Sequence, residues 1–126
     1  LLNAGLVASG GKLIFVSSVL GSITERRDGA LYAYAMSKAA LNMAVVTLSN
    51  ELPTLAKKGL VPEGILASAV HPGWVATDMG TTDFGVETAP VRPEDAAASI
   101  IKHAQELTAE GSGHFVDMTT GKDLPW

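Results

Sequence analysis

The apolar residues of this chain form two kinds of pattern, short continuous runs and longer periodic segments. Residues 12–17 and 64–71 are continuous runs with β-branched side chains, and each is bounded by glycine, serine or proline. A shorter run covers residues 113–117. Runs of this kind predict strands, and the first two predict strands that are buried on both faces of a parallel sheet.

Helical periodicity lies between these runs. From about residue 31 to residue 52, alanine and leucine form a broad apolar face, and Pro53 is expected to stop this helix nearby. Pro93 opens a second helix with acidic residues in its first turn, and Gly111 is expected to end it. A loop is predicted over residues 74–92. The residues expected on the inner face of the second helix are Ala97, Ile100, Ile101, Ala104 and Leu107.

The order strand, helix, strand, helix, strand predicts an α/β fold with two right-handed crossovers and a parallel sheet of three strands. Ligands of such sheets bind beyond the carboxyl ends of the strands. Ser17 and Ser18, the helix that carries Tyr34, and the turn at Pro72-Gly73 all lie at that end of the predicted sheet. Candidate chemistry therefore converges on one edge of the sheet from three parts of the chain.

Composition narrows the function classes. With 126 residues, 47% of them hydrophobic, the chain is one domain at most. A net charge of −4 argues against a nucleic-acid partner. The chain has no cysteine, and its three histidines are far apart without a ligand spacing, so no metal site is predicted. No apolar run approaches the roughly 20 residues that span a bilayer, so we expect no membrane segment and a cytoplasmic protein.

Tyr34 and Lys38 are four residues apart in the first predicted helix, so their side chains lie one above the other on one face. A neighbouring cation favours the phenolate form of a tyrosine. A phenol made more acidic in this way can exchange a proton, as acid/base catalysis of alcohol–carbonyl interconversion requires. An exposed lysine over a half-buried tyrosine is the structural alternative for the same spacing.

Three stretches, residues 12–18, 34–42 and 71–78, resemble the short-chain dehydrogenase/reductase family in content and in order. Residues 18–23 and the closing residues 124–126 are most similar to the carbonyl-reductase branch that includes C-factor and sniffer proteins. The resemblance implies a Rossmann-like, doubly wound parallel sheet.

Only the C-terminal half of the family pattern is matched. The glycine-rich turn that would cradle a cofactor pyrophosphate is absent. Asn3-Ala4-Gly5 spells a family strand motif, but it stands too close to Ser18, and we interpret it as a chance match at the end of a helix. We therefore interpret residues 1–126 as the C-terminal portion of a single domain whose N-terminal cofactor-binding half is missing.

The resemblance implies hydride transfer between a nicotinamide and a small carbonyl compound or secondary alcohol, with NADP as the cofactor and NAD as a possible one. Tyr34 would be the acid/base. Lys38 would make the phenol more acidic and bind the ribose of the nicotinamide. Ser18 would hold the substrate oxygen by a hydrogen bond.

The resemblance also implies that Pro72, Gly73, Val75 and Thr77 contact the nicotinamide, together with Tyr34 and Lys38. A Pro-Gly turn lets backbone approach a flat ring closely. Thr77 offers a donor and an acceptor to an amide, although a cap or turn hydroxyl is its alternative role.

Some alternatives stay open at this point. The chain is either such an oxidoreductase or a truncated, non-catalytic remnant whose exposed strand edge acts as an interaction module. A homodimer through the Tyr34 helix is possible. Trp74 and Phe84 either wall a substrate pocket or anchor a loop. Trp126, at the end of a polar tail, either closes over the site or packs against the fold.

Overall fold

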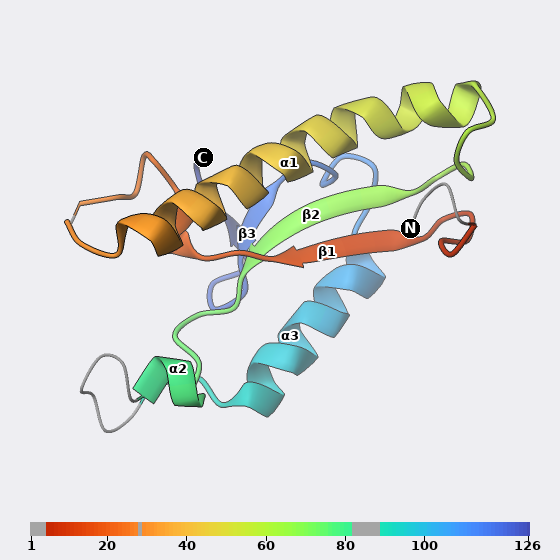
Figure 1. Cartoon of the computed structure of the whole chain (residues 1–126). Helices are drawn as coiled ribbons and strands as arrows, with labels where there is room; N and C mark the ends of the chain where they lie inside the picture. Colours follow the sequence, from red (N-terminus) through yellow and green to blue (C-terminus); the bar gives the residue numbers. More distant parts are fainter. Residues whose placement is uncertain (1–4, 28, 82–88) are drawn as a thin grey trace.

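The computed structural model describes residues 5–27, 29–81 and 89–126, and every structural statement below concerns these residues. They form a four-stranded sheet in the order β1-β2-β3-β4, with α1 on one face and α3 on the other (Figure 1). The sheet pairs β1 with β2 and β2 with β3 in parallel, which confirms the predicted α/β fold with crossover helices. The strands are β1 (Lys12–Val16), β2 (Leu66–His71), β3 (Phe115–Asp117) and β4 (Lys122–Asp123).

The sheet differs from the prediction in three ways. β4 lies in the predicted tail and pairs antiparallel with β3, and two polar residues are too few for a sequence pattern to reveal. β2 and β3 begin two residues later than expected, because Gly64 and Gly113 adopt positive φ angles of 73° and 87° that no strand contains. β1 is half-buried instead of buried, since it lies at an edge and has only one neighbouring strand.

The first helix, α1 (Tyr32–Lys57), runs past Pro53, so the prediction that proline stops it was wrong. A proline inside a helix removes one hydrogen bond of the ladder. Leu52 is buried in the core, and Leu55 and Ala56 pack against it, so apolar contacts on both sides of Pro53 outweigh the lost bond.

The other helices are α2 (Asp78–Thr81), inside the predicted loop, and α3 (Pro93–Glu106). α3 ends before Gly111, because Leu107 leaves the helical conformation with a ψ angle of 124°. The Lys12 ammonium donates a 2.6 Å hydrogen bond to the Leu107 carbonyl and so satisfies this helix end. Ala96 is buried, while Ile101 is 58% exposed and Ala97 is also exposed. The prediction that Ala97 and Ile101 lie on the inner face of α3 was therefore wrong. The buried position is Ala96, one residue earlier than the predicted Ala97.

The core lies between α1 and the sheet. Small side chains at Ala67 and Ala69 of β2 let the helix approach closely, and Val45 and Leu52 fill the space with Phe115 of β3. In the part of the chain that the structure describes, no helix combines the length and apolar character that crossing a bilayer requires.

Candidate active site

The carboxyl ends of β1 and β2 bring two of the sequence motifs together. The Ser17 amide donates a 2.8 Å hydrogen bond to the Val70 carbonyl, so the pairing of the two strands continues past Val16. Ser17 and Ser18 therefore lie beside His71 and the Pro72-Gly73 turn. Two of the three parts predicted to converge on this edge of the sheet therefore lie together.

Ser18 begins the short 3₁₀ helix η1 (Val19–Gly21) and is its N-cap. The Ser18 hydroxyl accepts a hydrogen bond from the Leu20 amide at 3.2 Å. A hydroxyl that accepts this bond still carries its own proton as a donor. Ser18 is 6% exposed, so this donor is held in a largely buried position.

Gly21 sets the distance between η1 and α1. A Cβ atom at this glycine would lie 2.7 Å from the backbone carbon and from the Cβ of Lys38, closer than real Cβ contacts. Only glycine therefore lets Ser18 and the Tyr34–Lys38 turn approach as they do. No role was predicted for Gly21 from the sequence, although its place in the stretch 18–23 that resembles the family is a usable signal.

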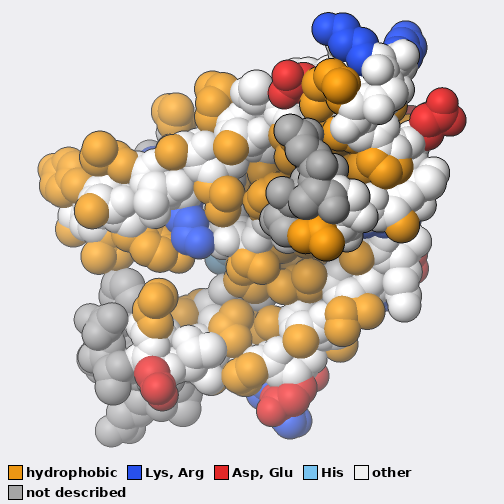
Figure 2. Space-filling model, turned by 45° about the vertical axis from the view of Figure 1, so that its right-hand side comes forward, with side chains coloured by type: hydrophobic (Ala, Val, Ile, Leu, Met, Phe, Trp, Pro, Cys, Tyr) orange, Lys and Arg blue, Asp and Glu red, His pale blue; other side chains and the backbone are white. Residues whose placement is uncertain are grey.

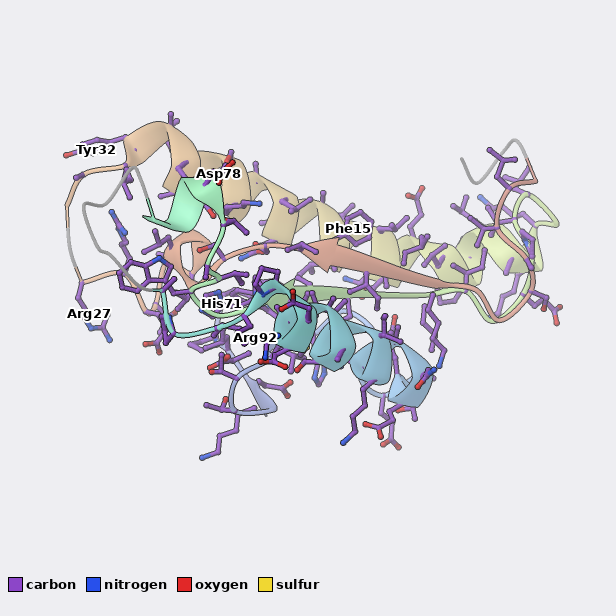
Figure 3. All side chains as sticks on the ribbon, turned by 90° about the horizontal axis from the view of Figure 1, so that it is seen from below. Phe15, Arg27, Tyr32, His71, Asp78 and Arg92 are labelled. Atoms are coloured by element: carbon purple, nitrogen blue, oxygen red, sulfur yellow. The ribbon has the colours of Figure 1, made fainter. Side chains whose placement is uncertain are left out.

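Tyr34 and Lys38 share one face of α1, as predicted. The Lys38 ammonium lies over the Tyr34 ring, 5.6 Å from its centroid, and donates a 3.0 Å hydrogen bond to the Val16 carbonyl. Both side chains are partly exposed. Tyr32 is 76% exposed and points away from the body of the molecule in Figure 3. The cation is thus beside Tyr34 and is anchored to the strand that leads into Ser18.

The close contacts around Gly73 leave no room for a side chain at this position. A Cβ atom there would lie 2.6 Å from the Thr119 methyl and 2.9 Å from a Val91 methyl. Its φ angle of 88° also favours glycine. The glycine thus lets the segment after β2 pack against the β3–β4 turn and the segment before α3.

Val75 and Thr77 belong to a segment that is tied to Val91. The Ala76 amide donates to the Val91 carbonyl at 2.8 Å. The Thr77 hydroxyl accepts a hydrogen bond from the Gly80 amide at 3.3 Å, so the cap role suggested by the sequence is present. The Trp74 indole donates to the Gly80 carbonyl at 2.8 Å and anchors this segment. Phe84 lies outside the described residues, as do Asn3 and Ala4, so their predicted roles stay predictions.

The last residues of the chain pack against the segment after η1. The Ser22 hydroxyl donates to the Pro125 carbonyl at 2.6 Å, and the Thr24 amide donates to the Trp126 carbonyl at 3.1 Å. The Trp126 ring stacks on Phe115 with centroids 5.5 Å apart. Of the two roles considered for Trp126, the structure shows packing.

His71, the last residue of β2, is held neutral by its surroundings. Burial lowers the pKa of His71, and the nearby Asp117 carboxylate only partly opposes this effect. Burial acts to raise the pKa of Asp117, but hydrogen bonds from Thr119 and Thr120 outweigh it, with a smaller contribution from His71 only when that ring is protonated, so the pKa of Asp117 lies below its usual value. Figure 3 shows His71 near the α2 end of the sheet.

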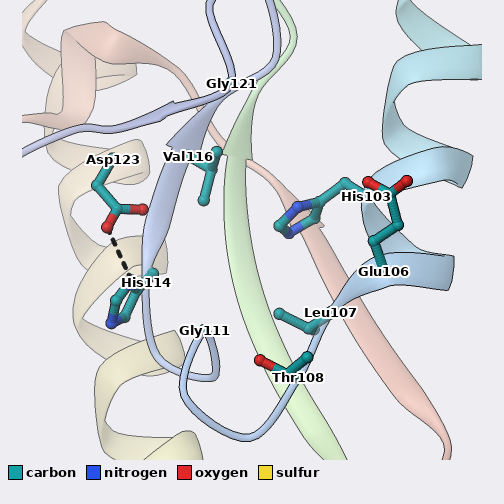
Figure 4. A pocket seen from close by; sticks show the side chains of 9 residues that line it. All are labelled: His103, Glu106, Leu107, Thr108, Gly111, His114, Val116, Gly121 and Asp123. Atoms are coloured by element: carbon teal, nitrogen blue, oxygen red, sulfur yellow. Dashed lines mark hydrogen bonds and ion pairs between the residues drawn. The ribbon is translucent and has the colours of Figure 1, made fainter.

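A hollow lies apart from these residues, between the end of α3 and the β3–β4 hairpin (Figure 4). Its volume is about 220 Å³, and His103, Glu106, His114 and Asp123 are among its lining residues. His114 Nδ1 lies 2.9 Å from an Asp123 carboxylate oxygen. This hollow contains none of the residues that the sequence predicted for the site.

Comparison with known proteins decides the family. The model of the short chain dehydrogenase family matches residues 2–86. The chain belongs to the short-chain dehydrogenases. It is 39% identical to the C-signal protein of Myxococcus xanthus over 115 residues, which cover 91% of this chain and 61% of that protein.

Solved structures of carbonyl reductases are similar to this short-chain dehydrogenase. Carbonyl reductase Sniffer of D. melanogaster matches with a TM-score of 0.76 and 35% identity, covering 92% of this chain and 41% of that one. An NADPH-bound carbonyl reductase from chicken fatty liver matches with a TM-score of 0.71 and 32% identity, covering 92% of this chain and 43% of that one. These matches confirm the carbonyl-reductase branch and the Rossmann-like fold. The chain spans between 41% and 61% of the length of these three relatives.

Proposed function

We propose that this short-chain dehydrogenase interconverts a small carbonyl compound and the corresponding secondary alcohol, with Ser18, Tyr34 and Lys38 as the catalytic residues. The observation that carries the proposal is the Lys38 ammonium over the Tyr34 ring, anchored to the strand that leads into Ser18. NADP is the proposed cofactor, supported by the NADPH bound in the similar chicken enzyme, with NAD as the alternative.

The residues at this edge fit the nicotinamide end of such a cofactor. Lys38 uses one hydrogen-bond donor on Val16 and has two more N–H groups to offer a ribose hydroxyl. Pro72, Gly73, Val75 and Thr77 form a backbone segment that can contact a carboxamide. The sequence contains no glycine-rich turn for the pyrophosphate, so the fit covers the nicotinamide end alone. This fit, with the coverage of the relatives, supports our view of the chain as the C-terminal portion of one domain.

The residues divide the chemistry between them. The cofactor, when bound, supplies or accepts the hydride. During reduction, Tyr34 donates its proton to the oxygen of the nascent alkoxide, and the Lys38 cation stabilises the phenolate that remains. The Ser18 hydroxyl donates a hydrogen bond to the same oxygen, where negative charge develops. In the oxidation direction the Tyr34 phenolate takes up the hydroxyl proton of the alcohol, and Ser18 keeps its own proton throughout.

Tyr34→Phe tests this assignment. Without the phenolic proton, turnover should fall by roughly 10²–10⁴-fold, the usual contribution of a general acid. Tyr32→Phe is the matched control, because Tyr32 is two residues away and 76% exposed, and it should leave turnover unchanged. If the unmodified residues 1–126 reduce a carbonyl compound with NADPH, within a complete domain where the cofactor requires it, and the Tyr34→Phe variant does so at the same rate, the assignment is refuted.

One observation favours the alternative of a non-catalytic interaction module. β1 lies at an edge of the described sheet, and Val16 at its end is 47% exposed. Figure 2 shows apolar side chains exposed between α1, at the top of the view, and α3, at the bottom, and also on α1 itself. Such an edge pairs readily with another chain. Fluorescence titration with NADPH separates the two functions, since tight binding contradicts a remnant without a cofactor site.

We also propose a homodimer through α1. Tyr32, Met36 and Met43 are 76%, 68% and 67% exposed, and their spacing puts them near one another along the outer side of the helix. Met36→Lys should convert a dimer into a monomer in light-scattering measurements. A monomeric unmodified chain would contradict the dimer.

A cytoplasmic location is a separate proposal. Recovery of the protein in a membrane or secreted fraction would contradict it.

A further inference from the structure

Two buried side-chain nitrogens beside the candidate active site have no hydrogen-bond partner among the described residues. They are Nδ2 of Asn42 and Nδ1 of His71. Asn42 is 4% exposed, and its Oδ1 accepts a 2.6 Å hydrogen bond from the Ser17 hydroxyl. A buried polar atom without a partner costs much of its desolvation energy, so native proteins rarely leave two such atoms unsatisfied.

Both nitrogens belong to the same small region. Ala67 and Ala69 of β2 pack with Val45 of α1 in the core, so His71, two residues further along the strand, lies on the same face of the sheet. The strand register continues through the Ser17–Val70 hydrogen bond and places Ser17 beside His71, at the roughly 4.8 Å spacing of neighbouring strands. Asn42 reaches the same Ser17 from α1.

The two nitrogens are also chemically complementary. Nδ2 of an asparagine is a donor, and an unprotonated ring nitrogen of a neutral imidazole is an acceptor. Burial lowers the pKa of His71, which keeps the ring neutral. A water molecule accepts one hydrogen bond and donates another, and Ser17 adds a third polar group to the site.

We propose that one buried water joins Asn42 Nδ2 to His71 Nδ1 and that Asn42, through this network, is a positioning residue for the active site. Asn42 lies one helical turn after Lys38, and Ser17 immediately precedes Ser18. His71 immediately precedes Pro72-Gly73. The network therefore fixes three segments relative to one another: the helix that carries Tyr34, the serine strand and the Pro-Gly turn. Its catalytic consequence rests on the proposed function, whereas its geometry does not.

NMR spectroscopy tests the geometry without any activity measurement. The chain contains only three asparagines, Asn3, Asn42 and Asn50, so ¹⁵N-asparagine labelling gives few side-chain signals, and the exposed Asn50 serves as an internal control. We expect slow exchange for the Asn42 amide protons and a cross-peak from them to a bound water. For ¹⁵N-histidine, we expect the His71 tautomer that carries its proton on Nε2. A His71 proton on Nδ1, or an Asn42 amide that exchanges as fast as that of Asn50, would overturn the proposal.

Substitution at His71 tests the positioning role. Asparagine can place an oxygen acceptor where Nδ1 lies, whereas glutamine reaches the Nε2 position instead. We expect His71→Gln to lower kcat roughly tenfold at unchanged KM, as loss of about one buried hydrogen bond predicts, and His71→Asn to restore most of that loss. Equal kcat in the two variants would overturn the role.

Asn42→Leu and Asn50→Leu form a matched pair for the same role. The first should lower kcat by at least as much as His71→Gln and shift the His71 ring signals, and the second should do neither. If Asn42→Leu leaves the His71 signals unmoved, the network does not exist. If Tyr34→Phe is fully active while the NMR results hold, the proposed function fails and the network remains.

Discussion

The two ends of the sheet differ in whether their polar side chains find hydrogen-bond partners within the protein. At the amino end, the Lys12 ammonium bonds the Leu107 and Gln105 carbonyls, and further along β2 His103 lies 3.0 Å from the Ser68 hydroxyl. At the carboxyl end, Asn42 and His71 each hold a nitrogen without a protein partner among the described residues. The polar groups named at the amino end bond to one another within the protein, whereas the two nitrogens at the carboxyl end are left for the buried water that we propose. This difference agrees with the proposed function, which places the chemistry at the carboxyl end.

The largest effect should come from the core that both ends share. Phe115 is 1% exposed and stacks on Trp126, whose carbonyl holds the segment after η1. Phe115→Ala should lower the free energy of unfolding by roughly 3–5 kcal/mol, because it leaves a cavity. Denaturant unfolding measures this change. Phe115→Leu should cost only about 1–1.5 kcal/mol, and an equal cost for the two variants would show that Phe115 is not a core residue.

The next effect should be confined to the carboxyl end. Gly21→Ala places a Cβ atom against the backbone of Lys38, which must separate η1 from α1. We expect a stability loss of about 1–3 kcal/mol, as for overpacking, and a loss of activity larger than the stability change explains.

Gly29→Ala is the control for Gly21→Ala, since a Cβ atom at Gly29 meets nothing within 4 Å. Thermal unfolding and carbonyl-reduction assays of both variants make the comparison. Unchanged activity of the Gly21→Ala variant would mean that the spacing between η1 and α1 does not position Ser18.

A smaller effect should be confined to the amino end. Lys12→Met removes the charged donor at the end of α3 but keeps most of the aliphatic stem. We expect a loss of about 1 kcal/mol in the free energy of unfolding, with activity per folded molecule unchanged. Lys102→Met is the control, because Lys102 is exposed and its ion pair with Glu106 is 4.0 Å long. A loss of activity on Lys12→Met would erase the distinction between the two ends.

The smallest effect should be a pH dependence that both ends share. Burial lowers the pKa of both His71 and His103 below the usual 6.5. At His71 the Asp117 carboxylate partly opposes this shift. At His103 the Asp123 and Glu106 carboxylates oppose it, and the Lys12 ammonium adds to it. The unfolded chain then binds protons more readily than the folded one. Stability is therefore complete above about pH 6.5 and falls as the pH drops below that value.

Melting temperatures between pH 7.5 and pH 5 measure this loss. His71→Asn and His103→Gln should each remove part of the slope. A melting temperature that is constant over this range in the unmodified chain would contradict both shifts.

Much of the fold could be predicted because local patterns carried it. The apolar runs at β1 and β2, the turn residues after them and the helical periodicity of α1 all follow from short-range spacing. The errors came where distant parts of the chain decide a boundary. Pro53 stays within α1 because the core holds the residues around it, and α3 ends where Lys12, from β1, reaches its last carbonyls.

The candidate site divides in the same way. The pairing of Tyr34 with Lys38 could be predicted, because a helix places residues four apart on one face. Gly21, Asn42 and His71 could not be assigned their places, since each depends on a contact with a different element. Gly21 contacts Lys38 where η1 packs against α1. Asn42 bonds Ser17 between α1 and the sheet, and His71 lies in the same polar region as Asn42.

The sequence alone determined the order and type of the main strands and helices and which chemical groups stand at the ends of the strands, since backbone periodicity and turn chemistry act over a few residues. Only the tertiary structure decided where the elements end, which polar groups are satisfied and how closely η1 approaches α1. Those properties arise from packing between segments that are far apart along the chain, and a linear pattern does not record that packing.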